Sequence, residues 1–474
     1  MTSLSIGLDR AKKTPLATQI YGAIRAAIES GQIPADAKLP SWRDLAAQLG
    51  VSRGTVRIAY ERLVDEQLAT SYGAAGTRVN GRPATPAGSG RAHAHSPDTS
   101  PIPELFPTFG AKPVPFQMGV PAQDAFPYKL WSRMMVSAAR HTAASPVGYP
   151  DPRGDPDLRR EVAAYLGIAR GIRCSPSQVL VTAGFAGALG LVVRTLALEG
   201  EQAWFEDPGF PLTRTALSLA GMAVTAVPVD ADGLDVDAGI RMAPGARLAV
   251  VTPGQQAPLG MTMTLARRRA LLDWAGANGA WIVEDDYLSE LQLEGRAAPA
   301  LASLDQGGRV LHIGTFSKTI SPALRLGFLV VPPELARRFG DVAACLAPAP
   351  GAPIQRAVAD FLQEGHYLRH LRRMKRLYAA RREALLRCLR KEAADVLAVQ
   401  ATAGMAVVTR LRTDASDVDV AARALQAGLA PVPLSPWYVH TPAARGLLLG
   451  VTNVDERRLA ADCRRLAGLA AITK

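Results

Sequence analysis

The chain is poor in cysteine: its 474 residues include only four, at positions 174, 345, 388 and 463. No two of them stand at the short spacing of a zinc ligand pair or a disulfide framework, so we predict neither, and no bound metal. The chain also lacks any run of about 20 apolar residues, which a membrane-spanning helix needs. Its N-terminus shows no apolar stretch followed by small residues, so no secretion signal is expected. We therefore predict a cytoplasmic protein without a membrane partner.

Positive charge is in excess, with a formal net charge of +12, but it is unevenly distributed. Residues 1–80 contain 10 Lys and Arg against 7 Asp and Glu, a net +3, whereas residues 366–391 contain 10 against 1, a net +9. The second segment has apolar residues at three-residue steps, which predicts a helix with one apolar face and one solvated basic face. These apolar residues are Leu368, Leu371, Met374 and Leu377. Contact of the basic face with a DNA backbone is the alternative interpretation.

The composition indicates a globular chain with more than one domain. Hydrophobic residues make up 48% and charged residues 20%, which is typical of a chain that folds around a core. A length of 474 residues predicts two or three domains. Residues 81–107 are rich in Pro, Gly, Ala, Ser and Thr and have no apolar period, which predicts a flexible linker. The linker would separate an N-terminal domain, residues 1–80, from a body, residues 108–474.

The N-terminal domain has the pattern of a DNA-binding motif. Residues 14–28 carry apolar side chains at helical spacing, and Ser41 and Ser52 stand where they would cap two further short helices. A three-residue turn containing glycine joins these two helices, which is the layout of a helix-turn-helix. Residues 68–72 and 77–79 predict two strands that form a wing.

The amino-acid sequence of this region resembles that of a known family of DNA-binding domains. The segments LPSWRDLAAQLGVSRGTVRIAYERL, residues 39–63, and YGAAGTRV, residues 72–79, closely resemble the winged-helix domain of the GntR superfamily. The resemblance implies that operator DNA is a partner, with the second helix of the motif in the major groove and the wing on the minor groove or the backbone. The implied DNA-contacting residues are Arg43, Ser52, Arg53, Thr55, Arg57, Tyr72 and Gly73.

A loop in the body surrounds one lysine with groups that suit a phosphate. In GTFSKTISPALRLG, residues 314–327, Lys318 follows an apolar run and has the hydroxyls of Thr315 and Ser317 beside it and Arg325 after it. Hydroxyls and an arginine suit a phosphate, and a buried lysine amine can form a Schiff base with an aldehyde. Pyridoxal 5'-phosphate carries both groups. A lone loop lysine is usually an ordinary surface residue, so the interpretation needs a second segment.

The second segment is WIVEDDY, residues 281–287, an apolar strand that ends in acids and an aromatic residue. Pyridoxal enzymes place an acid against the ring nitrogen. Asp285 is positioned for that role, and Tyr287 can reach the ring hydroxyl. Together the two segments resemble the fold-type I aminotransferases, and most closely the aminotransferase-like half of the MocR/GabR group of bacterial regulators. The implied fold class is α/β: a winged helix-turn-helix domain linked to a large parallel-sheet domain with a small C-terminal domain.

The same resemblance assigns further roles. The turn at Gly184 and Phe185 would bind the phosphate through backbone amides at a helix start. Phe210 would stack on the ring, and Gln256 would bond the ring hydroxyl. Tyr149 would reach across a homodimer interface to the partner's cofactor; the alternative is a buried core tyrosine.

Three positions depart from the pattern of these relatives. Phe210 stands where they carry tyrosine, Ala257 where they carry an aromatic residue, and Leu448 where they carry the arginine that clamps a carboxylate. We therefore weigh three functions. The first is a regulator that binds operator DNA and senses a small-molecule effector, an amino compound, through an aldimine at Lys318. The second is a working aminotransferase tethered to DNA, which the departures disfavour. The third is a sensor of pyridoxal phosphate itself, which the loss of the clamp favours.

Overall fold

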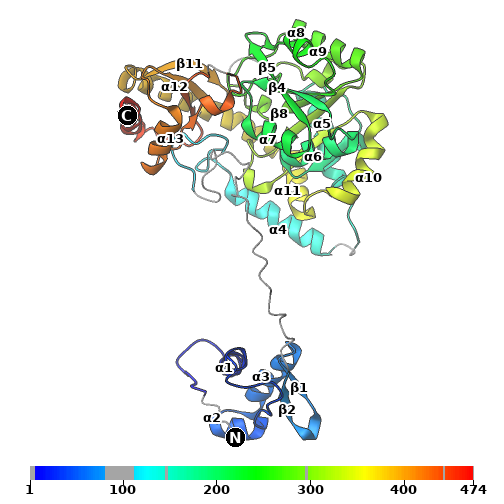
Figure 1. The fold of residues 1–474 in the computed structure, drawn as a ribbon, viewed down its shortest axis with the longest axis vertical. Helices are drawn as coiled ribbons and strands as arrows, with labels where there is room; N and C mark the ends of the chain where they lie inside the picture. Colours follow the sequence, from blue (N-terminus) through cyan, green and yellow to red (C-terminus); the bar gives the residue numbers. More distant parts are fainter. Residues whose placement is uncertain (1–5, 81–111, 145–147, 294–296, 441–442, 473–474) are drawn as a thin grey trace. The chain divides into compact units, whose positions relative to one another are not determined.

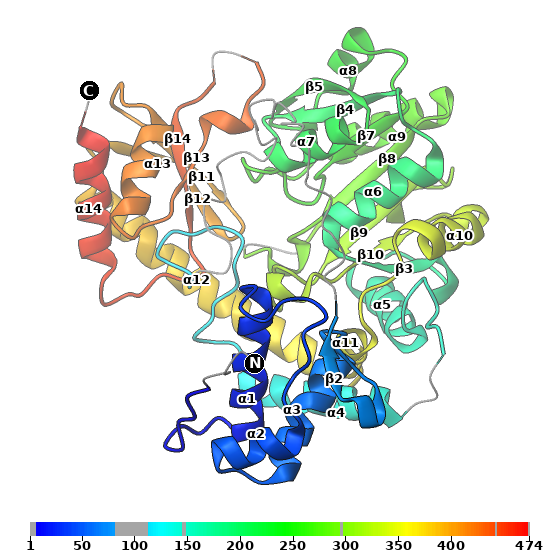
Figure 2. The same cartoon turned by 60° about the horizontal axis from the view of Figure 1, so that its bottom comes forward.

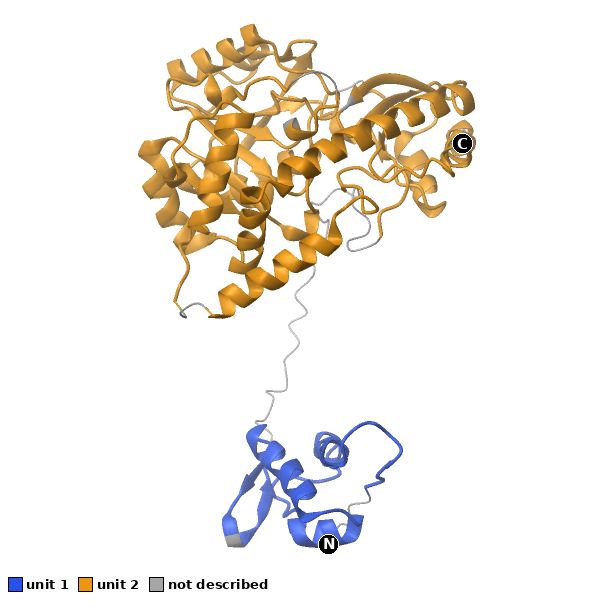
Figure 3. Ribbon diagram, turned by 180° about the vertical axis from the view of Figure 1, so that it is seen from behind, with its two compact units in different colours: residues 1–99 blue, residues 100–474 orange. Residues whose placement is uncertain are grey.

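The computed structural model describes residues 6–80, 112–144, 148–293, 297–440 and 443–472. Figures 1 and 2 show the ribbon from two sides, and Figure 3 colours its two compact units, residues 1–99 and 100–474. The predicted linker, residues 81–107, lies outside the described residues. None of the described helices is long and apolar enough to cross a membrane.

The N-terminal unit is a winged helix-turn-helix. Its elements are α1 (Leu16–Glu29), α2 (Trp42–Leu49), α3 (Arg53–Asp65), β1 (Ala69–Ser71), the 3-10 turn η1 (Gly73–Ala75) and β2 (Thr77–Val79). The side chain of Ser41 accepts the N–H of Asp44 at 3.1 Å, and that of Ser52 accepts the N–H of Thr55 at 3.1 Å. Gly50 ends α2 in the left-handed conformation, with φ +63°, which glycine adopts at little cost. The predicted caps, helices and antiparallel wing are confirmed.

One hydrophobic core holds this unit together. Ile20 and Ile24 of α1 are fully buried, as are Leu45 of α2 and Val56 and Leu63 of α3. The wing strands join the same core through their first and last residues. Because Val56, Ala59, Tyr60 and Leu63 of α3 point into this core, the polar residues of α3 lie on the outer face of the helix.

The body contains an eight-stranded sheet. Its strands are β3 (Val179–Thr182), β4 (Gln202–Asp207), β5 (Ala223–Asp230), β6 (Gly233–Leu234), β7 (Leu248–Val251), β8 (Trp281–Asp286), β9 (Val310–Thr315) and β10 (Gly327–Val330). They lie in the order β3-β10-β9-β8-β7-β4-β5-β6. The neighbours from β9 to β5 run parallel, whereas β10 is antiparallel to both β3 and β9. The predicted, mainly parallel sheet is confirmed, and its parallel strands end along one edge.

Helices cover both faces of this sheet. The helices are α4 (Tyr128–Ala144), α5 (Pro156–Ala169), α6 (Gly184–Leu196), α7 (Pro211–Leu219), α8 (Val236–Met242), α9 (Leu265–Asn278), α10 (Ala336–Leu346) and α11 (Ala352–Gln363). The short 3-10 turns are η2 (Pro176–Gln178), η3 (Ser289–Leu291), η4 (Leu301–Ser303), η5 (Pro322–Leu324) and η6 (Pro333–Leu335). Leu180 and Leu329 pack under α6 and α10, whereas Val181 and Phe328 point to the other face, towards α5 and α11. This alternation along each strand places a core on both faces.

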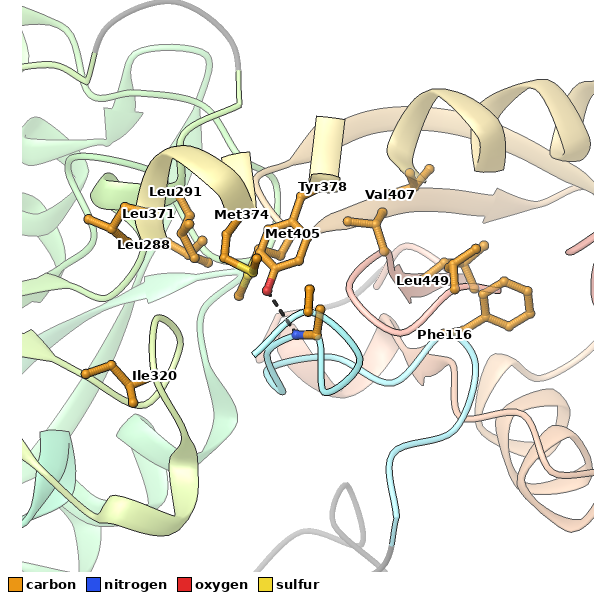
Figure 4. Packing of buried hydrophobic residues seen from close by; sticks show 14 of the residues in the cluster. Phe116, Leu288, Leu291, Ile320, Leu371, Met374, Tyr378, Met405, Val407 and Leu449 are labelled. Atoms are coloured by element: carbon orange, nitrogen blue, oxygen red, sulfur yellow. Dashed lines mark hydrogen bonds between the residues drawn. The ribbon is translucent and has the colours of Figure 1, made fainter. Parts of the chain in front are cut away.

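A smaller part follows the long helix α12 (His366–Glu392). Its elements are β11 (Leu397–Ala403), β12 (Ala406–Leu411), α13 (Asp417–Gln426), β13 (Val432–Pro433), η7 (Ser435–Trp437), β14 (Gly446–Gly450) and α14 (Leu459–Ala471). The four strands form an antiparallel sheet in the order β11-β12-β14-β13. Figure 4 shows the core between this sheet and α12, where the hydroxyl of Tyr378 accepts the N–H of Ala122 at 3.0 Å.

The predicted apolar face of α12 needs one correction. Leu371 and Met374 are buried as predicted, but Leu368 is 46% exposed. Three-residue steps drift around a helix that has 3.6 residues per turn, so the four leucine and methionine positions cannot share one face. The buried stripe instead continues through Tyr367 and Tyr378.

Candidate functional site

Lys318 lies at the sheet edge where the parallel strands end, three residues after β9. Its side chain is half-buried, and Nζ donates to the carbonyl oxygen of Gly119 at 3.2 Å. Gly119 has a φ of +76°, and a Cβ added there would stand 2.7 Å from Nζ. The segment around Gly119 therefore lies directly against the lysine amine, and a Cβ there would displace the end of the lysine side chain. No local pattern singles out Gly119, because the contact is between segments 199 positions apart.

Asp285 and Lys318 lie close enough for the charge of each to affect the pKa of the other. Burial raises the pKa of Asp285 to about 8; the neighbouring Asp286 carboxylate raises it further, and Lys318 opposes the rise. Burial lowers the pKa of Lys318, while the charge of Asp285 works against that change. A lowered pKa leaves more of the amine unprotonated and nucleophilic. The two residues predicted to act together are thus placed together.

The other side of β8 carries a buried polar network. Glu284 and Asp286 point away from Asp285, as alternate residues of a strand must. His312 Nδ1 pairs with Glu284 at 2.9 Å, and Arg170 Nε donates to Asp286 at 2.7 Å. Burial alone would lower the pKa of His312, but Glu284 reverses the effect and raises it. The network fixes the end of β8 and hence the position of Asp285.

The five residues predicted around a phosphate lie on the loop of Lys318 and on the helix start that this loop contacts. The N-terminus of α6 starts at Gly184, whose φ is +75°, and Ala183 before it supplies no side-chain cap. A Cβ added to Gly327 would stand 3.1 Å from the Cα of Gly184, so the lysine loop and this helix start are in close contact. Arg325 adopts φ +48° and its Nη2 donates to the Ala183 carbonyl at 3.5 Å. The predicted set is Gly184, Phe185, Thr315, Ser317 and Arg325, and the hydroxyl of Thr315 accepts the N–H of Ser317 at 3.1 Å.

Gln256 is buried, and its side chain forms hydrogen bonds within the protein. Its Nε2 donates to the carbonyls of Pro208 at 2.7 Å and Ala257 at 2.8 Å, and its Oε1 accepts the N–H of Leu259 at 3.0 Å. These contacts hold the turn after β7 against the turn after β4. The predicted bond from Gln256 to a ring hydroxyl would require it to give up one of them, and that role stays a prediction.

Glu206, at the same junction, was not predicted as a site residue. It is fully buried, accepts the hydroxyl of Thr252 at 2.5 Å and the N–H of Thr252 at 3.1 Å. Burial raises the pKa of Glu206 to about 7, although the hydrogen bonds from Thr252 oppose the rise.

Phe210 and Tyr287, two of the aromatic residues predicted for the site, border one apolar cluster. We call its buried members the apolar wall; they are Ala257, Val408, Leu434, Trp437 and Leu448. Met118 and Tyr438 also pack against it, and the rings of Phe210 and Trp437 lie 5.5 Å apart. Leu448, the position at which the resemblance implies an arginine, is therefore part of a buried hydrophobic cluster.

The loop after η7 is fastened to the turn after β4. Asp207 accepts the N–H of Val439 at 2.8 Å and of His440 at 3.1 Å, and the N–H of Gly209 donates to the carbonyl of Trp437 at 3.1 Å. These bonds hold the smaller part of the body against the aromatic turn of the larger part.

Tyr149 is not brought to this site. Its side chain is fully exposed, which excludes the buried core tyrosine considered above. Its predicted contact with a partner subunit stays a prediction.

The predicted DNA-contacting residues form a polar surface of the N-terminal unit. Arg43, Ser52, Arg53, Arg57, Tyr72 and Gly73 are exposed, and Thr55 is half-buried. The hydroxyls of Ser52 and Thr55 lie 2.8 Å apart, and Arg57 pairs with Glu61 at 3.3 Å. Ile58 on the same helix is 57% exposed, an apolar side chain that composition did not single out. An exposed apolar residue on α3 suits contact with a thymine methyl group.

Comparison with known proteins agrees with both units. Residues 16–79 match the family described as bacterial regulatory proteins, gntR family, and residues 127–448 match aminotransferase class I and II. The chain is 38% identical to the probable rhizopine catabolism regulatory protein MocR of Rhizobium meliloti, over 95% of this chain and 93% of that protein. It is 31% identical to the HTH-type pyridoxine biosynthesis transcriptional regulator PdxR of Corynebacterium glutamicum, over 97% of both chains.

Among solved structures, an archaeal alanine:glyoxylate aminotransferase has a TM-score of 0.69 and 26% identity, covering 76% of this chain and 91% of its own. LysN, the α-aminoadipate aminotransferase of Thermus thermophilus, has a TM-score of 0.67 and 28% identity, covering 75% of this chain and 91% of its own. The winged helix-turn-helix, the aminotransferase fold and the relatives that share both over nearly their whole length lead to one conclusion: the chain belongs to the MocR/GabR group of GntR-type transcription regulators.

Proposed function

We propose that this protein regulates transcription by binding operator DNA through its N-terminal unit and pyridoxal phosphate through Lys318, and that a small amino compound at the cofactor site alters DNA binding. The observation that carries the proposal is the placement of Lys318. A desolvated amine stands opposite a buried acid, beside an uncapped helix start and an arginine.

The residues present fit pyridoxal phosphate. The free N–H groups at the start of α6, with Arg325, suit the phosphate. Asp285 suits the ring nitrogen, whose protonated form would stabilise the carboxylate in turn. Phe210 offers a flat ring for stacking. When bound, the cofactor supplies an aldehyde with which amines condense reversibly, and burial keeps the amine of Lys318 ready for that reaction.

The cofactor part of the proposal is tested by chemical trapping. Borohydride reduction of the full-length protein with pyridoxal phosphate, followed by peptide mass spectrometry, should find the added mass on Lys318. The variant Lys318→Arg keeps the positive charge and should carry no label. A label on another lysine, or no label in the unaltered protein, would contradict the proposal.

The DNA part is tested on α3. Arg53→Ala should lose specific operator binding, because Arg53 is exposed at the start of the helix. Its guanidinium can donate two hydrogen bonds to the edge of a guanine base. Arg62→Ala is the matched control on the same helix: Arg62 packs over the ring of Tyr21, with 4.0 Å from its guanidinium carbon to the ring centroid, and pairs with Glu66. A footprinting titration in which both variants bind like the unaltered protein would refute the assignment.

We also propose that the protein is a homodimer. The exposed ring of Tyr149 and its place before α5 support a contact with a second subunit. Sedimentation of the full chain measures this directly; a monomer at micromolar concentration would contradict it.

A second candidate is that pyridoxal phosphate is itself the signal. The similarity to a regulator of pyridoxine biosynthesis and the apolar residue at position 448 both favour it. Operator affinity measured with and without the cofactor, in the absence of any amine, separates this candidate from the first.

A further inference from the structure

The long helix α12, drawn in Figures 1 and 2, exposes a line of positive charge. Each residue advances about 100° around the helix axis, so side chains three, four and seven positions apart share one face. The exposed cations of α12 fall within an arc of about 100° on one face and extend over about 33 Å of the helix. We call them the basic stripe; they are Arg369, Arg372, Arg373, Arg376, Arg387, Arg390 and Lys391.

The basic stripe has almost no negative charge beside it. Glu383 is the one exposed acid of α12, and its carboxylate pairs at 3.7 Å with Arg382, which is buried and not a member of the stripe. No cation of the stripe pairs with a carboxylate among the described residues; Arg369 donates to the carbonyl of Glu364 at 3.2 Å and contacts His366. By contrast, α1, α3, α10 and α11 each carry an arginine paired with an acid four positions further on.

This concentration of one sign is unfavourable for an isolated helix. Like charges three or four positions apart repel each other, as in the pairs Arg369 with Arg373 and Arg372 with Arg376. The helix dipole favours positive charge in the last turn of α12, but it opposes the charge of Arg369 in the first turn. A face that only meets water needs no such arrangement. A polyanion bound along the stripe would relieve the repulsion, which favours binding over simple solvation.

Duplex DNA matches the stripe in length and in charge. One turn of B-DNA rises about 34 Å, close to the length of about 33 Å that the stripe covers. Phosphates recur along this length, and arginines can contact them without reading the bases. DNA is also the polyanion that a GntR-type regulator brings to its own body. Once the N-terminal unit holds an operator, the flanking DNA and α12 belong to one complex, so a contact between them forms at a high effective concentration.

We propose that the basic stripe of α12 binds the backbone phosphates of the DNA that flanks the operator, whatever its sequence. This inference rests on the proposed function, because the N-terminal unit must first bind the operator. The N-terminal unit then supplies the sequence specificity, and the stripe supplies additional affinity that depends strongly on salt concentration.

The test compares three forms of the full-length protein on two duplexes. The short duplex contains only the base pairs whose methylation blocks binding, and the long duplex adds about 30 base pairs of arbitrary sequence on each side, about three times the length of the stripe. The stripe variant combines Arg372→Ala, Arg373→Ala and Arg376→Ala, and alanine at these exposed positions favours the helix. The control variant removes the same charge from exposed positions of α8 and α10, by Arg241→Ala, Arg337→Ala and Arg338→Ala.

The readout is the slope of the logarithm of affinity against the logarithm of salt concentration. If each of the three arginines contacts one phosphate, the stripe variant should have a slope on the long duplex that is less negative by about 2.7. Between about 50 and about 200 mM salt, the unaltered protein should therefore lose about 40-fold more affinity than the stripe variant. On the short duplex these two proteins should have equal slopes, and the control variant should match the unaltered protein on both duplexes.

Equal slopes of the stripe variant and the unaltered protein on the long duplex would overturn the inference. An equal change in the control variant would also overturn it, because net charge and not the stripe would then be responsible. Hydroxyl-radical footprinting of the unaltered protein gives a second readout that needs no variant: the backbone beyond the short duplex should be protected, and protection confined to the operator would contradict the inference. In each of these cases specific binding to the short duplex leaves the proposed function standing. If the unaltered protein binds the short duplex no more tightly than a scrambled duplex of the same length, the proposed function itself fails.

Discussion

The closeness of Gly119 to the lysine amine leads to a quantitative prediction for Gly119→Ala. The new Cβ would stand 2.7 Å from Nζ of Lys318, so the amine must retreat by roughly 0.8 Å to reach a contact distance of about 3.5 Å. A displacement near 1 Å at a reacting atom costs up to about 100-fold in rate. The φ of +76° adds a strain of about 1–2 kcal/mol in the folded state. We therefore expect slower condensation with pyridoxal phosphate together with a modest loss of stability.

Gly428→Ala separates the two effects. Gly428 has nearly the same φ, +75°, and a Cβ added there meets nothing within 4 Å. Both variants should lose about 1–2 kcal/mol in denaturant unfolding of the cofactor-free protein. Only Gly119→Ala should take up pyridoxal phosphate at least about tenfold more slowly, measured by the growth of cofactor absorbance after mixing. Equal uptake rates in the two variants would refute the argument that Gly119 positions the amine.

Three further predictions concern other contacts. Burial raises the pKa of Glu206 from its ordinary 4.5 to about 7. Between these two pH values the folded state holds a proton that the unfolded state releases. The free energy of unfolding should therefore fall by about 3 kcal/mol as the pH rises from about 4.5 to about 7. Glu206→Gln should flatten this part of the stability curve in the cofactor-free protein, and an unchanged slope would contradict it. Ser52→Ala removes the cap on the N–H of Thr55 and should cost about 1 kcal/mol, seen as faster amide exchange in α3 but not in the body. Asp207→Asn keeps one acceptor for the two N–H groups at 439 and 440, so exchange there should quicken, and exchange unchanged at both would contradict the fastening role.

Much of the fold could be predicted because its signals are local. Ser41, Ser52 and Gly50 specify helix ends through contacts within a few residues, and the structure shows those ends. The pairing of Asp285 with Lys318 was also predictable, since parallel strands end at one edge of a sheet and bring the residues that follow them together. The prediction that Leu368 lies on the buried face of α12 was wrong, because a three-residue step was treated as a full helical turn.

The sequence by itself determined which side chains the chain offers: a polar second helix in a helix-turn-helix, a lysine among groups that suit a phosphate, and an acid at a strand end. Only the tertiary structure decided what surrounds these groups. It placed Gly119 over the lysine, engaged Gln256 in a turn, and set Leu448 and Trp437 into one wall. The physical reason is range: caps and strand alternation depend on neighbours a few residues away, whereas burial and close approach depend on segments that meet only after the chain has folded.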